Sequence, residues 1–123
     1  MLVFLMALTG GVGAVCRYGL DKTISSKAVN KSTFPWGTFV VNSLGSLLLG
    51  AITALHVHAK LNSELATLFG TGFCGSFTTF STYMYESFKL IEEGSWTQGL
   101  KNILGTALFC AGFGAIGLIL GGI

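Results

Sequence analysis

Four long apolar stretches constrain the fold of this chain more than any other feature of its sequence. They cover about residues 2–20, 37–55, 65–88 and 100–122. A helix needs about 20 apolar residues to cross the hydrocarbon core of a bilayer, and isolated strands cannot satisfy their backbone groups there. Only 10% of the residues are charged, whereas a soluble domain has about 25%. The sequence therefore predicts an all-α integral membrane protein in which residues 1–123 form a single four-helix, multi-pass transmembrane domain.

The same composition argues against several classes of function. The net charge of +2 provides no basic surface for nucleic acid, and the chain holds few of the polar groups that an enzyme needs. Each cysteine lies within an apolar stretch, which favours buried thiols over disulfides or zinc ligands. The cysteines are Cys16, Cys74 and Cys110. The sequence predicts membrane lipid as the surroundings, and it implies no enzyme, no nucleic acid and no soluble protein partner.

Polar side chains inside the apolar stretches are gathered into three groups. The second stretch carries Thr38, Asn42 and Ser46, and the fourth carries Asn102, Thr106 and Cys110. A spacing of four residues puts each of these groups on one helix face. The third stretch carries Ser76, Thr78, Thr79, Ser81 and Thr82. Hydroxyls and amides without carboxylates suit an anion path, because they donate to an anion and do not repel it. For a single hydroxyl, a bond back to its own helix or to a neighbouring helix is the alternative.

The third stretch also carries glycines and aromatic rings. Gly70, Gly72 and Gly75 precede the Ser/Thr group, and each glycine lowers helix stability by about 1 kcal/mol relative to alanine. Both a local break and a kinked but continuous helix are compatible with this pattern. Phe77, Phe80 and Tyr83 lie three residues apart and are expected along one helix face. Such rings form either an apolar stripe or a set of positive ring edges that can face an anion.

Lys and Arg are unevenly divided between the two sides that four spans would create. One side holds Arg17, Lys22, Lys27, Lys31, Lys89 and Lys101. The other side holds Lys60 alone. The positive-inside rule then predicts that the lysine-rich connections are cytoplasmic and that both termini lie outside. Because four spans cannot easily enclose a path, the sequence also favours an oligomer.

Three segments carry a specific set of motifs. They are GGVGAVCRY at residues 10–18, WGTFVVNSLGSLLLG at residues 36–50 and GFCGSFTTFSTY at residues 72–83. Together they resemble the small bacterial fluoride channels of the CrcB or Fluc family, over the whole length of the chain. The resemblance implies a fluoride-selective ion channel of the bacterial inner (plasma) membrane, built as a dual-topology, antiparallel homodimer. It also implies a broken third helix, two fluoride pathways and a central structural sodium ion.

The polar groups and the resemblance together indicate which residues form the fluoride pathway. They are Arg17, Thr38, Asn42, Phe80, Ser81, Thr82, Tyr83, Asn102 and Thr106. Arg17 would attract the anion near the mouth, and Asn42 would donate an amide hydrogen to it. Phe80 and Tyr83 would present ring edges, and the hydroxyls would replace water donors. Tyr83 stands where the family usually has Phe, and its added hydroxyl would either donate to fluoride or obstruct the path.

Two other roles are predicted, the first from the same resemblance and the second from the position of a carboxylate. Backbone carbonyls of Gly75 and Thr78, contributed by both subunits, would hold the sodium ion. Glu86, at the end of the third stretch, is the carboxylate closest to the proposed path and is a candidate gate. The alternative for Glu86 is a solvated charge at the membrane surface.

The implied activity is passive export of fluoride. Hydrogen fluoride crosses the bilayer and ionises in the cytoplasm, and a channel lets the trapped anion leave down the membrane potential. One alternative is half of a heterodimeric fluoride channel, which the uneven lysine distribution favours. Another is a small multidrug exporter, also a four-helix dual-topology dimer, which needs a carboxylate deep in a span. The carboxylates of this chain all lie at span ends or in connections: Asp21, Glu64, Glu86, Glu92 and Glu93.

Overall fold

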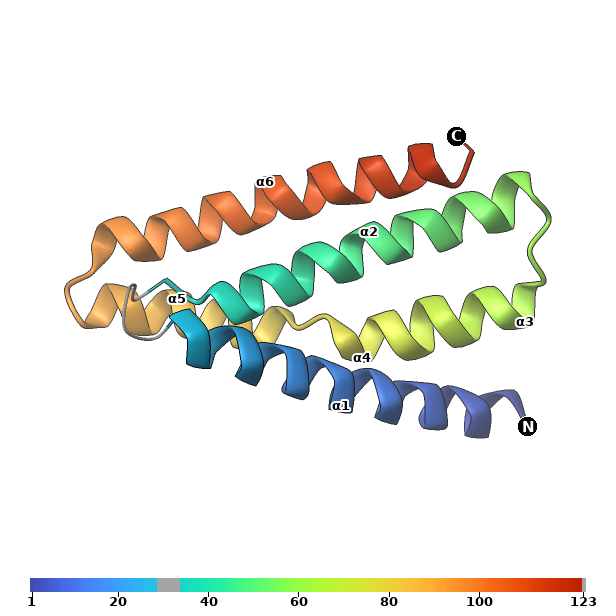
Figure 1. The fold of residues 1–123 in the computed structure, drawn as a ribbon, viewed down its shortest axis with the longest axis horizontal. Helices are drawn as coiled ribbons and strands as arrows, with labels where there is room; N and C mark the ends of the chain where they lie inside the picture. The colour runs from blue at the N-terminus through green and yellow to red at the C-terminus, as the bar shows by residue number, and fades with distance from the viewer. Residues whose placement is uncertain (29–33, 123) are drawn as a thin grey trace.

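A computed structural model of the chain describes residues 1–28 and 34–122, and every regular element within them is a helix (Figure 1). Three helices are long: α1 (Leu2–Ala28), α2 (Trp36–His58) and α6 (Trp96–Leu120). The third apolar stretch forms a series of shorter ones: α3 (Ser63–Ala66), η1 (Thr67–Cys74), α4 (Gly75–Phe77) and α5 (Phe80–Glu92). The all-α prediction is confirmed. Lys31, one of the residues that entered the charge comparison, lies outside the described residues.

Three segments of the described chain are long and apolar enough to cross a membrane. They are Leu2–Lys27, Trp36–His58 and Trp96–Leu120. Helix α1 extends beyond the first apolar stretch, which covers about residues 2–20, and continues to Ala28. No glycine or proline interrupts residues 20–28, and hydroxyls in this part bond within the helix, as Thr23 Oγ1 does to the Gly19 carbonyl at 2.8 Å. The change from apolar to charged residues therefore does not mark the end of this helix.

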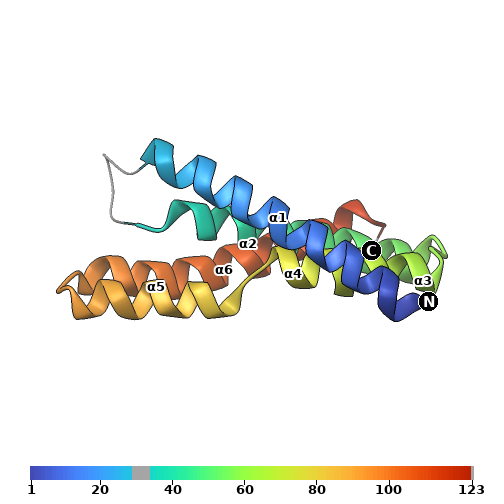
Figure 2. The same cartoon turned by 90° about the horizontal axis from the view of Figure 1, so that it is seen from below.

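The helices lie side by side with α1 and α6 on the outside and α2 and the α3–α5 series between them (Figure 1). Both termini lie at one end of the molecule, together with the connection from α2 to α3 (Figure 1). In the perpendicular view, α1 crosses the other helices at an angle (Figure 2). The termini and the second connection therefore share one end, which is compatible with the four spans expected from the sequence.

Helices α2 and α6 approach each other closely because glycines line their contact. A Cβ atom on Gly117 would collide with the carbonyl of Leu47, and one on Gly50 would collide with the carbonyl of Gly114. Small residues of this kind allow close backbone packing between membrane helices. This pair of helices supplies two walls of the candidate site described below.

Helix η1 is a π-helix of 8 residues, packed against α1. A Cβ atom on Gly13 of α1 would collide with the carbonyl of Phe73, and one on Gly72 would collide with the Thr9 hydroxyl. π-helical hydrogen bonds run from i to i+5 and occur mostly in single turns, frequently at functional sites. The glycine-rich part of the third stretch therefore forms a wide helix against α1.

Thr78 and Thr79, here called the Thr78–Thr79 link, join α4 to α5 in extended conformation (Figures 1 and 2). Their φ and ψ angles are −85° and 158°, and −148° and 115°. The expectation that Phe77, Phe80 and Tyr83 share one helix face is wrong, because the link separates Phe77 from the other two. Phe77 stacks on Phe73, with ring centroids 5.5 Å apart.

Candidate functional site

A pocket of about 380 Å³, here called the central pocket, lies beside the Thr78–Thr79 link between α2, α5 and α6. It is lined by Asn42, Gly45, Ser46, Leu49, Thr78, Thr79, Phe80, Tyr83, Thr106, Ala107 and Cys110. The pocket brings together an amide, several hydroxyls and two aromatic rings from segments that are far apart in the sequence. No carboxylate is among these lining residues. This combination suits a small anion, which accepts hydrogen bonds and is repelled by carboxylates.

Asn42 holds the link in place through two hydrogen bonds. Its Nδ2 donates to the carbonyl of Thr79 at 3.0 Å, and its Oδ1 accepts from the Thr79 backbone N–H at 2.8 Å. The amide of Asn42 therefore replaces the helical partners that Thr79 lacks in its extended conformation. An amide nitrogen carries two hydrogens, so one of them remains for a ligand in the pocket.

Arg17 reaches the link from α1. Its Nε donates to the carbonyl of Ser76 at 3.1 Å, within the last turn before the helix ends at Phe77. A cationic side chain at the carboxyl end of a helix pairs with carbonyls that have lost their helical donors. The guanidinium thus lies beside the link and is half-buried.

The link also changes the hydrogen bonding of the two carbonyls that were predicted to hold sodium. In a continuous helix the carbonyls of Gly75 and Thr78 would accept from the N–H groups of Thr79 and Thr82. Those N–H groups instead donate to Asn42 Oδ1 at 2.8 Å and to Thr79 Oγ1 at 3.2 Å. Neither carbonyl keeps its helical donor, and carbonyls of an unwound membrane helix are typical ligands of Na⁺.

Gly45 gives Thr78 the space that the link requires, and alanine at this position is expected to destabilise the protein. A Cβ atom there would collide with Thr78 Cγ2 and lie 3.3 Å from Phe77 Cδ2. Overpacking of this kind costs about 1–3 kcal/mol, which thermal unfolding in detergent would measure. Adding Thr78→Ser removes the colliding methyl and keeps the hydroxyl that donates to the Cys74 carbonyl. The double variant should recover most of the lost stability, and equal melting temperatures of the single and double variants would contradict this account.

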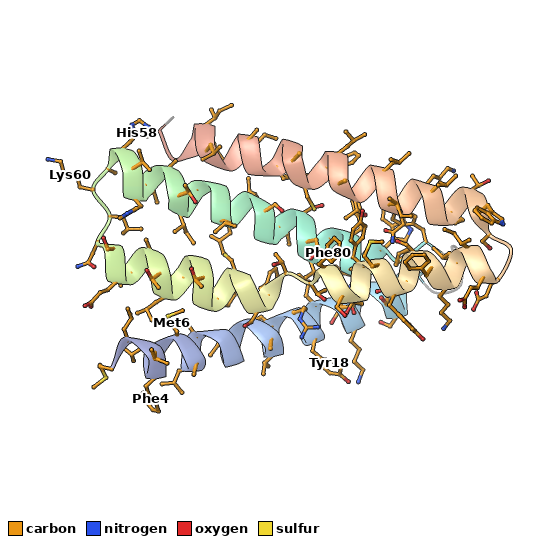
Figure 3. All side chains as sticks on the ribbon, turned by 180° about the vertical axis from the view of Figure 1, so that it is seen from behind. Phe4, Met6, Tyr18, His58, Lys60 and Phe80 are labelled. Atoms are coloured by element: carbon orange, nitrogen blue, oxygen red, sulfur yellow. The ribbon has the colours of Figure 1, made fainter. Side chains whose placement is uncertain are left out.

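Phe80 and Tyr83 form an edge-to-face pair at the start of α5, with ring centroids 5.7 Å apart and an interplanar angle of 64°. Figure 3 labels Phe80 where α5 begins, next to the link. Phe80 is 74% exposed, whereas Tyr83 is 8% exposed. The Tyr83 hydroxyl donates to the carbonyl of Ile103 on α6 at 2.5 Å. Its proton is therefore used within the protein, and the ring is fixed between α5 and α6.

The Tyr83→Phe variant is expected to lose stability and to retain most of the fluoride efflux that the resemblance implies. It loses the bond to Ile103, which is worth about 0.5–1.5 kcal/mol, while the ring edge beside Phe80 is kept. Thermal unfolding and efflux from liposomes would be measured on the same preparation. A change in efflux larger than tenfold would mean that the hydroxyl itself contacts the ion.

Asn102 lies in a buried network between α5 and α6. Its Nδ2 donates to Ser87 Oγ at 2.7 Å, and Ser87 Oγ donates to the Tyr83 carbonyl at 2.8 Å. Thr106 Oγ1 donates to Asn102 Oδ1 at 3.0 Å. Thr106 lines the central pocket and Asn102 does not. Sequence reasoning missed Ser87, although its spacing with Tyr83 and Leu90 (i, i+4, i+7) marks one buried helix face.

Thr38 and Glu86 meet at the end of the molecule away from the termini. The Thr38 hydroxyl donates to Glu86 Oε1 at 2.5 Å. Asp21 and Lys89 lie close enough for their charges to act on Glu86, and Asp21 accepts a hydrogen bond from Ser25 at 3.1 Å. Glu86 is half-buried and accepts a hydrogen bond from a protein hydroxyl, whereas a freely solvated carboxylate accepts hydrogen bonds from water alone. Its role as a gate stays a prediction.

The remaining predicted pathway residues lie outside the pocket lining. Ser81 is exposed and Thr82 is half-buried, with Thr82 Oγ1 accepting from Thr79 Oγ1 at 3.2 Å. Conversely, Ser46 and Thr79 line the pocket but were not selected as pathway residues. Both belong to the polar groups of the sequence, so the signal was present. The sequence does not show the course of the backbone at the Thr78–Thr79 link, which places these side chains in the pocket.

The family model and the most similar proteins that we report all belong to the CrcB or FluC group. Residues 4–118 match the family model described as "CrcB-like protein, Camphor Resistance (CrcB)". A "Fluoride-specific ion channel FluC" of Shewanella frigidimarina is 43% identical over 108 residues, which cover 88% of this chain and 86% of that protein. A protein of the same name from Phocaeicola vulgatus is 38% identical over 97% of this chain and 93% of its own length. The "Fluoride-specific ion channel FluC 1" of Thermobifida fusca is 42% identical over 94% of this chain and 89% of its own length.

Proposed function

Because the chain belongs to the CrcB family, we propose that it is a fluoride-selective ion channel whose pathway runs through the central pocket. One observation carries this proposal: the pocket joins the Asn42 amide, the Phe80–Tyr83 ring pair and neutral side chains of α2 and α6, with no carboxylate in its lining. The relatives that match over most of the chain are named as fluoride-specific ion channels. These names describe ion channels and not enzymes.

Hydrogen bonding limits which groups can donate to the ion. Tyr83 and Thr106 use their single protons on Ile103 and Asn102, so in this arrangement they offer oxygens and not donors. The second amide hydrogen of Asn42 and the hydroxyl of Ser46 are the groups we assign to the anion. The edge of the Phe80 ring, which is positive, complements them.

A second copy of the chain would complete the site, as a homodimer. Phe80 lines the central pocket and is 74% exposed in the single chain, which supports a neighbour on this side. The carbonyls of Gly75 and Thr78, which have lost their helical donors, would hold a sodium ion between the copies. Bound there, the ion would add positive charge near the pathway. Antiparallel, dual-topology packing in the inner membrane is part of this proposal.

Passive transport distinguishes a channel from a proton-coupled exporter. Moving one charge across a potential of 100 mV changes its free energy by about 2.3 kcal/mol. This corresponds to a ratio of about 50 between the fluoride concentrations on the two sides of the membrane. Liposomes containing the purified chain, with equal pH inside and outside, should redistribute fluoride toward this ratio and reverse when the potential is reversed. Fluoride movement that ignores the potential, or that is no faster than in protein-free liposomes, would overturn the proposal.

A further inference from the structure

A second pocket, of about 230 Å³ and here called the outer pocket, lies where the end of α2 meets α3 and η1. Its polar lining consists of Thr53, His56, Ser63, Thr67 and Thr71. This is the end of the molecule at which Figure 3 labels His58 and Lys60. The outer pocket is not part of the central pocket, and none of the residues predicted to form the pathway lines it.

The two pockets follow one another along a single face of α2. The α2 residues that line them are Asn42, Gly45, Ser46, Leu49, Ile52, Thr53 and His56. These positions recur at intervals of three and four residues, which is the spacing of one helix face. Leu49 lines both pockets. The α2 face therefore runs from the outer pocket past one apolar side chain to the central pocket.

The outer pocket shares with the central one a set of hydroxyls and a lining without carboxylates. Hydroxyls and an imidazole supply its polar groups, and no carboxylate is among its lining residues. Thr53 donates to the Leu49 carbonyl at 2.8 Å, and His56 Nδ1 donates to the Leu61 carbonyl at 2.8 Å. The hydroxyls of Thr67 and Thr71 come from the π-helix η1.

We propose that the outer pocket is an antechamber for the anion, and that Leu49 is the apolar constriction between it and the central pocket. This inference rests on the proposed channel function and extends it to a segment with no assigned role. A partly hydrated fluoride ion would exchange water for the hydroxyls of Ser63, Thr67 and Thr71 before it passes Leu49, because Thr53 uses its single proton on the Leu49 carbonyl. Thr71 is exposed, so a charged side chain there can be accommodated and would act on the ion directly.

A charge-reversal pair at Thr71 tests this inference. Thr71→Lys and Thr71→Glu have similar bulk, and fluoride efflux from liposomes should be about fivefold lower for Glu than for Lys in low salt. The difference should shrink at 1 M salt, where the Debye length is about 3 Å. His58→Lys and His58→Glu form the control, because His58 is exposed at the same end and lies outside the pocket. This second pair should differ by less than twofold.

Equal efflux of the two Thr71 variants, or an equal difference for the His58 pair, would overturn the antechamber. Ser63, also exposed and in the lining, provides a second Lys/Glu pair with the same expected order if a Thr71 variant does not fold. The unsubstituted chain is measured in the same series. If the unsubstituted chain does not conduct fluoride, the proposed function is wrong. If it conducts fluoride but the Lys and Glu variants of each pair have equal efflux, only the antechamber is wrong.

Discussion

Fluoride efflux is expected to fall about 100-fold when Asn42 is replaced by alanine, which corresponds to about 2.7 kcal/mol. The variant removes both hydrogen bonds to the Thr79 backbone and the amide hydrogen that remains for the anion. A buried backbone group without a partner costs about 1–3 kcal/mol, so the Thr78–Thr79 link would also lose its fixed conformation. Efflux from liposomes under a fixed potential measures this effect.

The adjacent residue provides a matched control. Ser43 is also buried on α2, but its hydroxyl has no hydrogen-bond partner in the described structure. Ser43→Ala should therefore keep full efflux and at least the original stability. Equal losses in the Asn42 and Ser43 variants would show that the site depends on general packing of α2 and not on the Asn42 amide.

Fluoride efflux is expected to fall roughly tenfold in the Phe80→Leu variant, because an aromatic pair contributes about 0.5–1.5 kcal/mol beyond its buried area. Leucine keeps an apolar side chain at the pocket but removes the ring edge and the contact with Tyr83. Since Phe80 is 74% exposed, the fold of the single chain should be little affected. The measurement is the initial rate of efflux together with the melting temperature.

Phe88 on the same helix is the control for this substitution. It is 57% exposed and does not line the central pocket. Phe88→Leu should leave efflux within twofold of the unsubstituted chain. If Phe80→Leu conducts as well as Phe88→Leu, ring edges have no part in conduction.

The sequence predicts the helical class well, because apolar stretches of about 20 residues have few alternatives in lipid. It predicts helix ends poorly: α1 continues to Ala28 and α5 to Glu92, since charged residues that leave the membrane remain good helix formers. The extended conformation of Thr78 and Thr79 could not be predicted from composition. Their conformation depends on Asn42 and on the space at Gly45, both on another helix.

The candidate site was predictable in its residue types but not in its hydrogen bonds. The four-residue spacing placed Asn42 and Thr106 on pocket-lining faces, as found. The spacing could not show that Thr106 donates a hydrogen bond to Asn102, or that the Tyr83 hydroxyl donates one to the Ile103 carbonyl. Donor and acceptor pairing depends on the relative rotation of two helices, which the sequence of one helix does not contain.

Selectivity is the most direct test of the central claim. Liposomes containing only this purified chain would be loaded with equal concentrations of fluoride and chloride, and both ions would be followed with electrodes under a potassium diffusion potential. We expect rapid release of fluoride with chloride release no greater than in protein-free liposomes, without a second protein. Equal release of the two anions, or no release of fluoride from a folded chain, would contradict the account of the central pocket as a self-sufficient fluoride pathway.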